Sequence, residues 1–598
     1  FGQLIILIVF VPILALTGIE GKMFRPMAAT FCFALIAAFL LAFSVIPALA
    51  GLLLIGKPQP PNSQRFNLMS TLQQAYAATL KLALRFQRIV LTLAIILLVT
   101  GAMLYARLGG EFIPRLYEGA AAFQFVRPLS ISMDASIALE KKSQQLLLEF
   151  PEVDRVFARI GTAEIATDAM GVNLADTYIM FRPRSEWPAI DGARRTPSEL
   201  IAALRSHLEA HIPGQRILVS QPIQLRFNEL LEGARADVNL KIFGEDLDVL
   251  QALTRDATRI ISAIPGAGEV EPELRGKVPM LVVTPRDAVL REMGLSRAEL
   301  LDTIEIGMGG KQVGFLYRGL KRFPIYVRLS TERRGDLEKL RRLPVGVEEN
   351  FTVPLERLAT IEFRETYEMI KRDSFRRRGA VLINPRGRDT ESLVNAARER
   401  IESELDVPPD YYLEWGGNFK NLEQARLTLA SLVVLAFLIV LGMIYSVFQD
   451  WRRTGLVLLG VPFALVGGVL SLQLYSIPFS VSAGVGFIAL FGISILNGIV
   501  LMSHYGDMKS AGLAGRELAI QGGIHRLRPV LMTALTDALG FLPMMTATGL
   551  GAGVQRPLAT VVVGGVMTST FVILILLPVL HCMFERYLYT DQRNDPLK

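Results

Sequence analysis

Cysteine is nearly absent from this sequence, which limits the chemistry that the chain can perform. Among 598 residues only Cys32 and Cys582 occur, both in or beside apolar runs, and the polar stretch 108–426 has none. A disulfide framework and a thiolate metal site are therefore excluded from that stretch. The GxxxxGK[ST] phosphate-binding pattern is also missing, so ATP is not the predicted source of energy. We find no nucleophile with a paired base, and we predict neither an enzyme nor a tightly bound cofactor.

Charged residues are scarce and apolar residues are abundant. They make up 20% and 51% of the chain, and the mean hydropathy is +0.38, which is too apolar for a soluble globular protein. Eight runs are long enough to cross about 30 Å of hydrocarbon; they lie at 3–19, 27–54, 89–107, 427–448, 455–475, 479–503, 529–550 and 557–583. We therefore predict a polytopic α-helical membrane protein with one large polar domain between the third and fourth runs.

Basic residues gather on one side of the predicted membrane. On that side 14 Lys and Arg residues fall in the segments 57–88, 449–454, 504–528 and 584–598. The short turns on the other side carry only Lys22, Arg25 and Arg556. By the positive-inside rule the four basic segments face the cytoplasm and the large domain lies outside. The net charge of +7 follows this topology and does not indicate a nucleic-acid partner.

One membrane motif occurs twice. FVPILALTGIEGKMFRPMA (residues 10–28) aligns without a gap with FLPMMTATGLGAGVQRPLA (residues 541–559), and both contain F-x-P, T-G and R-P at the same positions. Internal repeats of this kind are typical of transporters built from two similar halves. Because Phe1 already lies inside an apolar run, we expect the chain to be the later part of a longer protein, with eight of an expected twelve transmembrane helices.

The polar domain contains two βαββαβ patterns, which are typical of ferredoxin-like units. In the first, predicted strands at AAFQFV, VDRVFARI, TYIMF and RILVSQ accompany two amphipathic helices. In the second, the predicted strands are VNLKIFG, EVEPEL, MLVVTP, AVLINP and YYLEWGG, interrupted by an insertion. Before this domain, the segment RFNLMSTLQQAYAATLKLALRFQR is predicted to be a helix in the membrane interface. The alternative is that it extends the next membrane helix.

Several stretches carry a resemblance to known proteins: GGEFIPRLYEG, NLADTYIMFRPRSEW, RFNELLEGARADVNLKIFGED, NFKNLEQA, GVPFALVGG, LRPVLMTALTDALGFLPM and VQRPLATVV. They resemble the heavy-metal efflux branch of the resistance–nodulation–division transporters, and within it the cobalt–zinc–cadmium type. RFNEL followed by G-x-R-x-D-V is the part most specific to that branch. The resemblance implies a proton-driven homotrimer in the Gram-negative inner membrane, with its large domain in the periplasm. It also implies two partners, a periplasmic adaptor and an outer-membrane channel.

The resemblance also implies a division into parts. They are transmembrane helices closing the first half at 1–56, a cytoplasmic linker and interfacial helix at 57–88, a transmembrane helix at 89–107, a first porter subdomain at 108–235, a second at 236–285 and 365–423, an inserted docking subdomain at 286–364, a five-helix transmembrane bundle at 424–583 and a cytoplasmic tail at 584–598.

Asp537 is an acidic residue well inside an apolar membrane run. Such carboxylates are costly and often mark ion pathways, and Thr533 lies one turn away on the same helix face. We predict a proton relay of Asp537, Thr533 and Asn497; the alternative is a structural cap or an Asp that faces water. The resemblance places Thr533 at the usual relay threonine, and it puts Leu496 where drug exporters carry a lysine. It assigns the central relay acids to a helix that this chain lacks.

Carboxylates near the ends of predicted strands are the candidate metal ligands. Oxygen ligands suit hard and borderline divalent ions, whereas thioethers suit Cu(I) and Ag(I). The resemblance assigns the three cleft methionines of the copper and silver branch to Gln124, Leu174 and Glu229, none of which offers sulfur. We therefore predict that the substrate is Zn²⁺, Co²⁺, Cd²⁺ or Ni²⁺, and that the ligands, in order of preference, are Asp176, Glu229, Glu118, Asp168 and Glu111.

Other interpretations stay open. Each carboxylate could be a solvated surface residue, and we interpret His207 and His211, although spaced i and i+4, as surface residues. We interpret the scattered methionines of the polar domain as core residues. The alternative functions are a multidrug exporter, which would need an aromatic cleft, and a membrane-anchored periplasmic scaffold without transport, which would not need Asp537.

Overall fold

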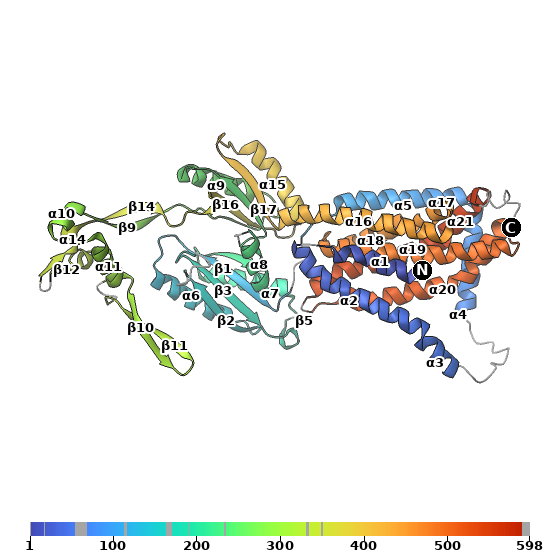
Figure 1. Ribbon diagram of the computed structural model, residues 1–598, viewed down its shortest axis with the longest axis horizontal. Coiled ribbons are helices and arrows are strands. Elements are labelled where there is room, and N and C mark those ends of the chain that lie inside the picture. The colour runs from blue at the N-terminus through green and yellow to red at the C-terminus, as the bar shows by residue number, and fades with distance from the viewer. Residues whose placement is uncertain are drawn as a thin grey trace.

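The structure is a computed structural model that describes residues 2–16, 18–53, 68–112, 117–162, 170–190, 192–232, 235–330, 334–348, 351–549 and 551–588. The molecule is elongated (Figure 1). A bundle of long helices forms one end, two α/β units lie in the middle, and a small inserted unit forms the far end.

Seven helical spans in the described residues are long and apolar enough to cross a membrane. They are α2 (Gly18–Phe43) with α3 (Val45–Leu53), α5 (Gln87–Arg107), α16 (Asn418–Phe448), α17 (Trp451–Leu458) with α18 (Gly460–Leu474), α19 (Val481–Ser510), α20 (Gly515–Thr546) and α21 (Ala552–Leu588). This arrangement agrees with the polytopic architecture that the apolar runs predict.

Two predicted boundaries differ from the structure. The run predicted to span the membrane at 3–19 forms the shorter α1 (Gly2–Leu14), which ends in a turn where the amides of Ala15 and Leu16 bond back to carbonyls of the helix. The runs predicted at 479–503 and 529–550 continue as helix into the basic segment 504–528, because α19 ends at Ser510 and α20 begins at Gly515. Apolar runs mark only the part of a helix that lies in hydrocarbon, so polar extensions of the same helix escape a hydropathy criterion.

Glycines on both helices allow α18 and α21 to approach closely. A Cβ added at Gly564 would lie 2.5 Å from the Cβ of Ser471 and 2.7 Å from the carbonyl oxygen of Gly467. Such distances leave no room for a methyl group, so the two backbones touch as small-residue helix pairs do in membranes. The central helix α19 packs against α1, α16, α18, α20 and α21.

The helix predicted at the membrane interface is α4 (Leu68–Arg85), and it is separate from α5. Phe86 divides them with non-helical torsion angles of φ −111° and ψ 47°. The side of α4 that carries Tyr76 packs on the bundle, where the Tyr76 hydroxyl donates to the carbonyl of Leu574 at 2.7 Å. α4 is therefore not a continuation of the span that follows it.

The first α/β unit has the predicted ferredoxin-like order. Its elements are β1 (Ala120–Val126), α6 (Met133–Leu148), β2 (Val153–Ile160), β3 (Leu174–Phe181), η1 (Arg184–Glu186), β4 (Ala189–Ile190), β5 (Ala193–Arg194), α7 (Pro197–His211) and β6 (Arg216–Ser220). The main strands pair antiparallel in the order β2-β3-β1-β6. Leu147 of α6 and Leu204 of α7 pack on Phe123 and Ile179 of the sheet, which buries β1 completely. The helix α8 (Pro222–Glu232) leads out of this unit.

The second α/β unit repeats this plan. Its elements are β7 (Val238–Phe243), α9 (Leu247–Ser262), β8 (Glu269–Pro272), β15 (Arg372–Asp373), β16 (Arg376–Asn384), α15 (Thr390–Glu404) and β17 (Tyr412–Gly417). The path is β15-β16-β7-β17, and β8 also pairs with β16. MLVVTP is a strand as predicted, in β9 (Lys277–Pro285), but it lies outside this sheet and forms a separate ribbon with β14 (Ala359–Tyr367). Since β8 already occupies the place beside β16, the chain leaves the sheet at β9.

The ribbon of β9 and β14 carries the inserted unit at the far end (Figure 1). This unit contains α10 (Asp287–Glu292), α11 (Arg297–Met308), β10 (Lys311–Arg318), β11 (Lys321–Val327), α13 (Leu337–Arg341), β12 (Pro344–Glu348), β13 (Phe351–Pro354) and α14 (Leu355–Leu358). It has its own buried core, which includes Leu290, Leu300, Leu340 and Leu355. The hairpin of β10 and β11 projects from it (Figure 1).

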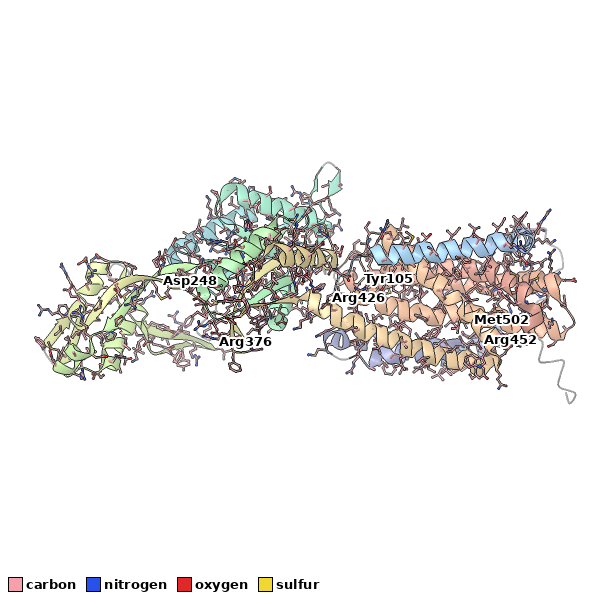
Figure 2. All side chains as sticks on the ribbon, turned by 90° about the horizontal axis from the view of Figure 1, so that it is seen from above. Tyr105, Asp248, Arg376, Arg426, Arg452 and Met502 are labelled. Atoms are coloured by element: carbon pink, nitrogen blue, oxygen red, sulfur yellow. The ribbon has the colours of Figure 1, made fainter. Side chains whose placement is uncertain are left out.

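The second α/β unit joins the membrane bundle directly. Gly417 ends β17 with φ 82°, a backbone conformation that favours glycine, and α16 begins at the next residue. Figure 2 places Tyr105 of α5 and Arg426 of α16 at the end of the bundle nearest the α/β units, and Arg452 at the opposite end. The position of Arg452 agrees with the prediction that its basic segment and the large domain lie on opposite sides.

Candidate functional site

Strand register places Asp176 in the middle of a polar row. On β3 it lies opposite Gln124 of β1 on one side and opposite Arg159 of β2 on the other. Its carboxylate accepts from Gln124 Nε2 at 3.0 Å and from Arg159 Nη2 at 2.7 Å. Asp176 is 1% exposed, so these bonds compensate for the desolvation of the charge.

Glu229 reaches the same place from the helix α8. This helix is held at its beginning by Glu118, whose carboxylate accepts from the backbone amides of Ile223 at 2.7 Å and Gln224 at 3.1 Å. A carboxylate at a helix N-terminus satisfies amides that have no partner within the helix. Glu229 lies near the other end of α8, where it also pairs with Arg226 at 2.8 Å. Glu118 therefore positions the helix that presents Glu229.

Arg235 joins the two carboxylates. Its Nη1 lies 2.6 Å from Asp176 Oδ1, and its Nη2 and Nε lie 3.1 and 3.3 Å from Glu229 Oε1. Nη1 also contacts the sulfur of Met170 at 3.2 Å. The guanidinium is 10% exposed, and it thus occupies the position where Asp176 and Glu229 converge. The two highest-ranked candidates from the sequence are brought together by this one cation.

A cavity of about 120 Å³ lies beside this cluster, between the two α/β units. The first unit and its exit segment contribute Gln124, Met170, Asn173, Leu174, Glu229 and Arg235. The second unit and the ribbon contribute Glu273, Arg275, Glu368, Met369, Lys371 and Leu382. Because Met170 and Met369 both line the cavity, the interpretation of these methionines as plain core residues is incomplete.

The wall contributed by the second unit carries its own charges. Although burial would raise the pKa of Glu273, Lys371 at 2.6 Å and Arg378 at 2.5 Å hold that pKa below its ordinary value. Burial instead raises the pKa of Glu368, since its Coulombic attraction to Arg275 only partly offsets desolvation. Glu273 is therefore a committed ion-pair partner, whereas Glu368 is the cavity carboxylate that accepts a proton more readily.

Among the described candidate ligands, Glu118 and Glu111 do not join Asp176 and Glu229. Glu111 borders a different cavity at the membrane end, where its amide donates to the carbonyl of Phe479 at 2.8 Å. Asp168 lies outside the described residues. Within the residues that the structure describes, no group of three or more His, Cys, Asp or Glu is close enough to hold a metal ion.

The two histidines of α7 are neighbours whose rings are tilted by 48° to each other. His207 Nε2 lies 2.9 Å from Glu149 Oε2, and His211 Nδ1 lies 2.8 Å from the carbonyl of His207. The two rings are 4.4 Å apart between centroids. These contacts occupy one nitrogen of each ring, and neither histidine lines the cavity.

Two members of the predicted relay meet in the membrane. The Thr533 hydroxyl of α20 lies 3.1 Å from Asn497 Oδ1 of α19, and also within bonding distance of the carbonyls of Pro529 and Val530. Asn497 is buried. Asp537 lies one turn further along α20 and is partly buried; in the described part of the chain it makes no hydrogen bond or ion pair.

Sequence reasoning missed the cations of the site. Arg235 stands inside the G-x-R-x-D-V motif, so the motif could have indicated it. Only the nearby acidic residues were considered, because they can be metal ligands. The cavity residues Glu273, Glu368 and Lys371 stand in no motif that could have marked them. They follow β8 in the chain, and only the fold brings them to the cavity.

Nearly the whole chain is similar to one protein family. The sequence profile of the AcrB/AcrD/AcrF family matches residues 1–585. The chain belongs to the AcrB/AcrD/AcrF family. It is 43% identical over 592 residues to the cobalt-zinc-cadmium resistance protein CzcA of Cupriavidus metallidurans, covering 98% of this chain and 55% of that protein. It is 39% identical over 583 residues to the nickel-cobalt-cadmium resistance protein NccA of Alcaligenes xylosoxydans xylosoxydans, covering 97% and 54%. The predicted resemblance to the heavy-metal efflux branch is confirmed.

Two further proteins are similar to the chain at lower sequence identity. A crystal structure of a heavy metal efflux pump superposes with a TM-score of 0.84 at 31% identity, covering 98% of this chain and 58% of that chain. The cation efflux system protein CusA of Escherichia coli is 29% identical over 588 residues, covering 96% and 55%. The predicted fold class is confirmed, and the chain spans about half the length of the curated relatives that it matches.

Proposed function

We propose that this protein exports divalent heavy-metal cations, Zn²⁺, Co²⁺, Cd²⁺ or Ni²⁺, through the cleft between its two α/β units. The observation that carries the proposal is the convergence of Asp176 and Glu229, from a strand and a separate helix, on one point occupied by a cation. Two carboxylates that together bind a guanidinium can also coordinate a metal ion, and oxygen ligands suit these divalent ions. A transport site must release its ion, so a sparse ligand set is no objection.

We further propose that protons drive export, through Thr533, Asn497 and Asp537 together with acids on helices outside this chain. One proton moving across 100 mV supplies about 2.3 kcal/mol. The contact between Thr533 and Asn497 supports a hydrogen-bonded path between α20 and α19. The protein would act as a homotrimer in the Gram-negative inner membrane, with the large domain in the periplasm. A periplasmic adaptor and an outer-membrane channel would be its partners.

A second candidate function is the export of hydrophobic or amphiphilic compounds. A cavity of about 1050 Å³ lies among α5, α16, α18 and α19, with Tyr105, Phe479, Phe487 and Phe491 on its wall. Aromatic and aliphatic linings are typical of sites for such ligands. This cavity is distinct from the carboxylate cleft, so the two candidates predict sensitivity to different substitutions.

The test is metal flux in proteoliposomes with an imposed pH gradient, using the protein with any sequence that precedes Phe1 retained. Zn²⁺, Co²⁺, Cu(I) and a fluorescent amphiphile are followed in parallel. Asp176→Asn and Glu229→Gln keep the shape of each side chain and remove its charge, so we expect Zn²⁺ or Co²⁺ flux to fall at least about tenfold. Glu209→Gln is the matched control, because Glu209 is a 47% exposed carboxylate paired to Arg205 on α7.

The outcomes separate the candidates. Gradient-dependent Zn²⁺ or Co²⁺ flux that survives Glu209→Gln and is lost in the two cleft variants supports metal export. Cu(I) flux in place of divalent flux would contradict the substrate assignment. Amphiphile flux without metal flux would favour the apolar cavity, and no flux of any kind would favour a scaffold.

A further inference from the structure

We propose that the Arg235 guanidinium is an internal substitute for the transported cation, and that metal must displace it to bind Asp176 and Glu229. The inference rests on the proposed function, and it assigns to Arg235 the role of a specificity-determining gate at the metal site.

The first observation is geometric. A single guanidinium contacts one oxygen of Asp176 at 2.6 Å and one oxygen of Glu229 at 3.1 and 3.3 Å. The Met170 sulfur lies 3.2 Å from the same Nη1. Arg235 is thus surrounded by two oxygen donors and one sulfur donor, which is a ligand set that a borderline divalent ion such as Cd²⁺ or Zn²⁺ accepts.

The second observation is electrostatic. Asp176 and Glu229 contribute two negative charges, and Arg159, Arg226 and Arg235 contribute three positive charges. With the guanidinium in place the cluster is already over-neutralised, and a divalent ion would be repelled rather than attracted. If Arg235 leaves, the two remaining arginines balance the carboxylates and a cation can compete for their oxygens.

The third observation is that the chain just after Arg235 is anchored to α8, while the Arg235 side chain borders a cavity. Arg235 lies between α8 and β7 and belongs to neither. Two residues later, the Asp237 carboxylate accepts from the side chains of Gln224 at 2.6 Å and Asn228 at 3.2 Å, which ties Asp237 to α8. A change of the Arg235 rotamer would leave these hydrogen bonds in place, and the cavity beside Arg235 offers space for the displaced guanidinium.

Together these observations describe an exchange of cations. In the state seen here the carboxylates hold Arg235, so their charge is compensated without metal. An incoming divalent ion takes the carboxylate oxygens and the guanidinium turns away. Its return then helps to expel the ion, since the same oxygens cannot serve both partners. Monovalent cations compete poorly with a guanidinium that bridges two carboxylates, so the exchange favours higher charge.

The decisive experiment measures Zn²⁺ and Cd²⁺ affinity calorimetrically for the purified protein with any preceding sequence retained. Arg235→Gln should lower Kd by roughly 10- to 100-fold, the range that one or two charge-assisted hydrogen bonds represent. Arg235→Lys keeps the charge but not the fork, and its Kd should lie between those of the other two proteins. In flux assays Arg235→Gln should lower both KM and kcat, because metal binds more tightly and leaves more slowly.

Arg155→Gln is the matched control. It removes a guanidinium of β2 that is 74% exposed and pairs with Asp154 outside the cluster, so Kd should change less than about threefold. Asp176→Asn should abolish the affinity gained in Arg235→Gln if the ion binds at this cluster. The visible spectrum of bound Co²⁺ should show the same ligand field in the wild type and in Arg235→Gln.

The result that overturns the proposal is an unchanged or higher Kd in Arg235→Gln. A higher Kd that Arg235→Lys restores would mean that the arginine holds the site together. If the wild type transports metal and Arg235→Gln binds it no better, this inference fails and the proposed function stands. If the wild type neither binds nor transports metal, the proposed function fails and this inference falls with it.

Discussion

The buried ion pair behind the cleft gives the sharpest prediction about stability. Glu140 of α6 and Arg127, just after β1, lie 2.6 Å apart with side-chain exposures of 4% and 0%. Glu140 also accepts from Thr177, the neighbour of Asp176 on β3, at 2.7 Å. Substituting Glu140→Gln keeps the shape and leaves the Arg127 charge buried without a counter-ion.

The expected destabilisation follows from that burial. Breaking a buried pair by removing one partner costs about 3–5 kcal/mol, because the other charge is left uncompensated. For a domain of about 150–250 residues, each kcal/mol lowers Tm by about 2–4 °C, so the apparent Tm should fall by roughly 6–20 °C. Removing both charges in Glu140→Gln with Arg127→Met should restore much of the loss, since an apolar replacement has no desolvation penalty.

The assay is thermal unfolding of the detergent-solubilised protein at one fixed scan rate, with the single and double variants compared side by side. A drop below about 2 °C for Glu140→Gln would refute the reasoning. So would a double variant that loses the sum of the two single effects, because a direct pair must be strongly non-additive.

Two further predictions concern packing and pH. Gly564→Ala should lower the apparent Tm by the equivalent of about 1–3 kcal/mol, because its Cβ would meet Ser471 Cβ at 2.5 Å, whereas Gly442→Ala on α16, with no heavy atom within 4 Å, should leave it unchanged; equal effects would contradict close packing of α18 and α21. Asp373→Asn should destabilise the protein, because a hydrogen bond from the buried Lys241 ammonium at 2.8 Å holds the pKa of Asp373 below its ordinary 3.8. Since that pKa is depressed, the stabilisation is full above the ordinary value and is lost as pH falls through the folded-state pKa; a difference between wild type and Asp373→Asn that persists unchanged in strong acid would exclude this cause.

The sequence by itself determined the architecture, because the signals for it are local. Apolar runs long enough to cross a bilayer, the strand and helix periodicities of both α/β units, and the repeated turn at 10–28 and 541–559 can each be recognised without knowing what lies beside them. The same is true of Asp176 and Glu229, which stand in distinctive motifs. Where local signals end, the predictions are inexact. The parts of α19 and α20 that lie in 504–528 are not apolar, so the ends of these helices were missed. MLVVTP has a strand pattern, but the pattern does not show which sheet it joins.

Only the tertiary structure decided what surrounds the two carboxylates. Asp176 meets Arg159 because β2 and β3 pair in one particular register, and a slip of one residue would turn the row to the other face. Glu229 and Arg235 reach it through a helix that the sequence pattern did not predict. Periodicity likewise cannot reveal that Glu140 is buried against Arg127. Pairing partners distant in the chain are chosen by the free energy of burying charge together, and that free energy exists only once the fold has removed water from both.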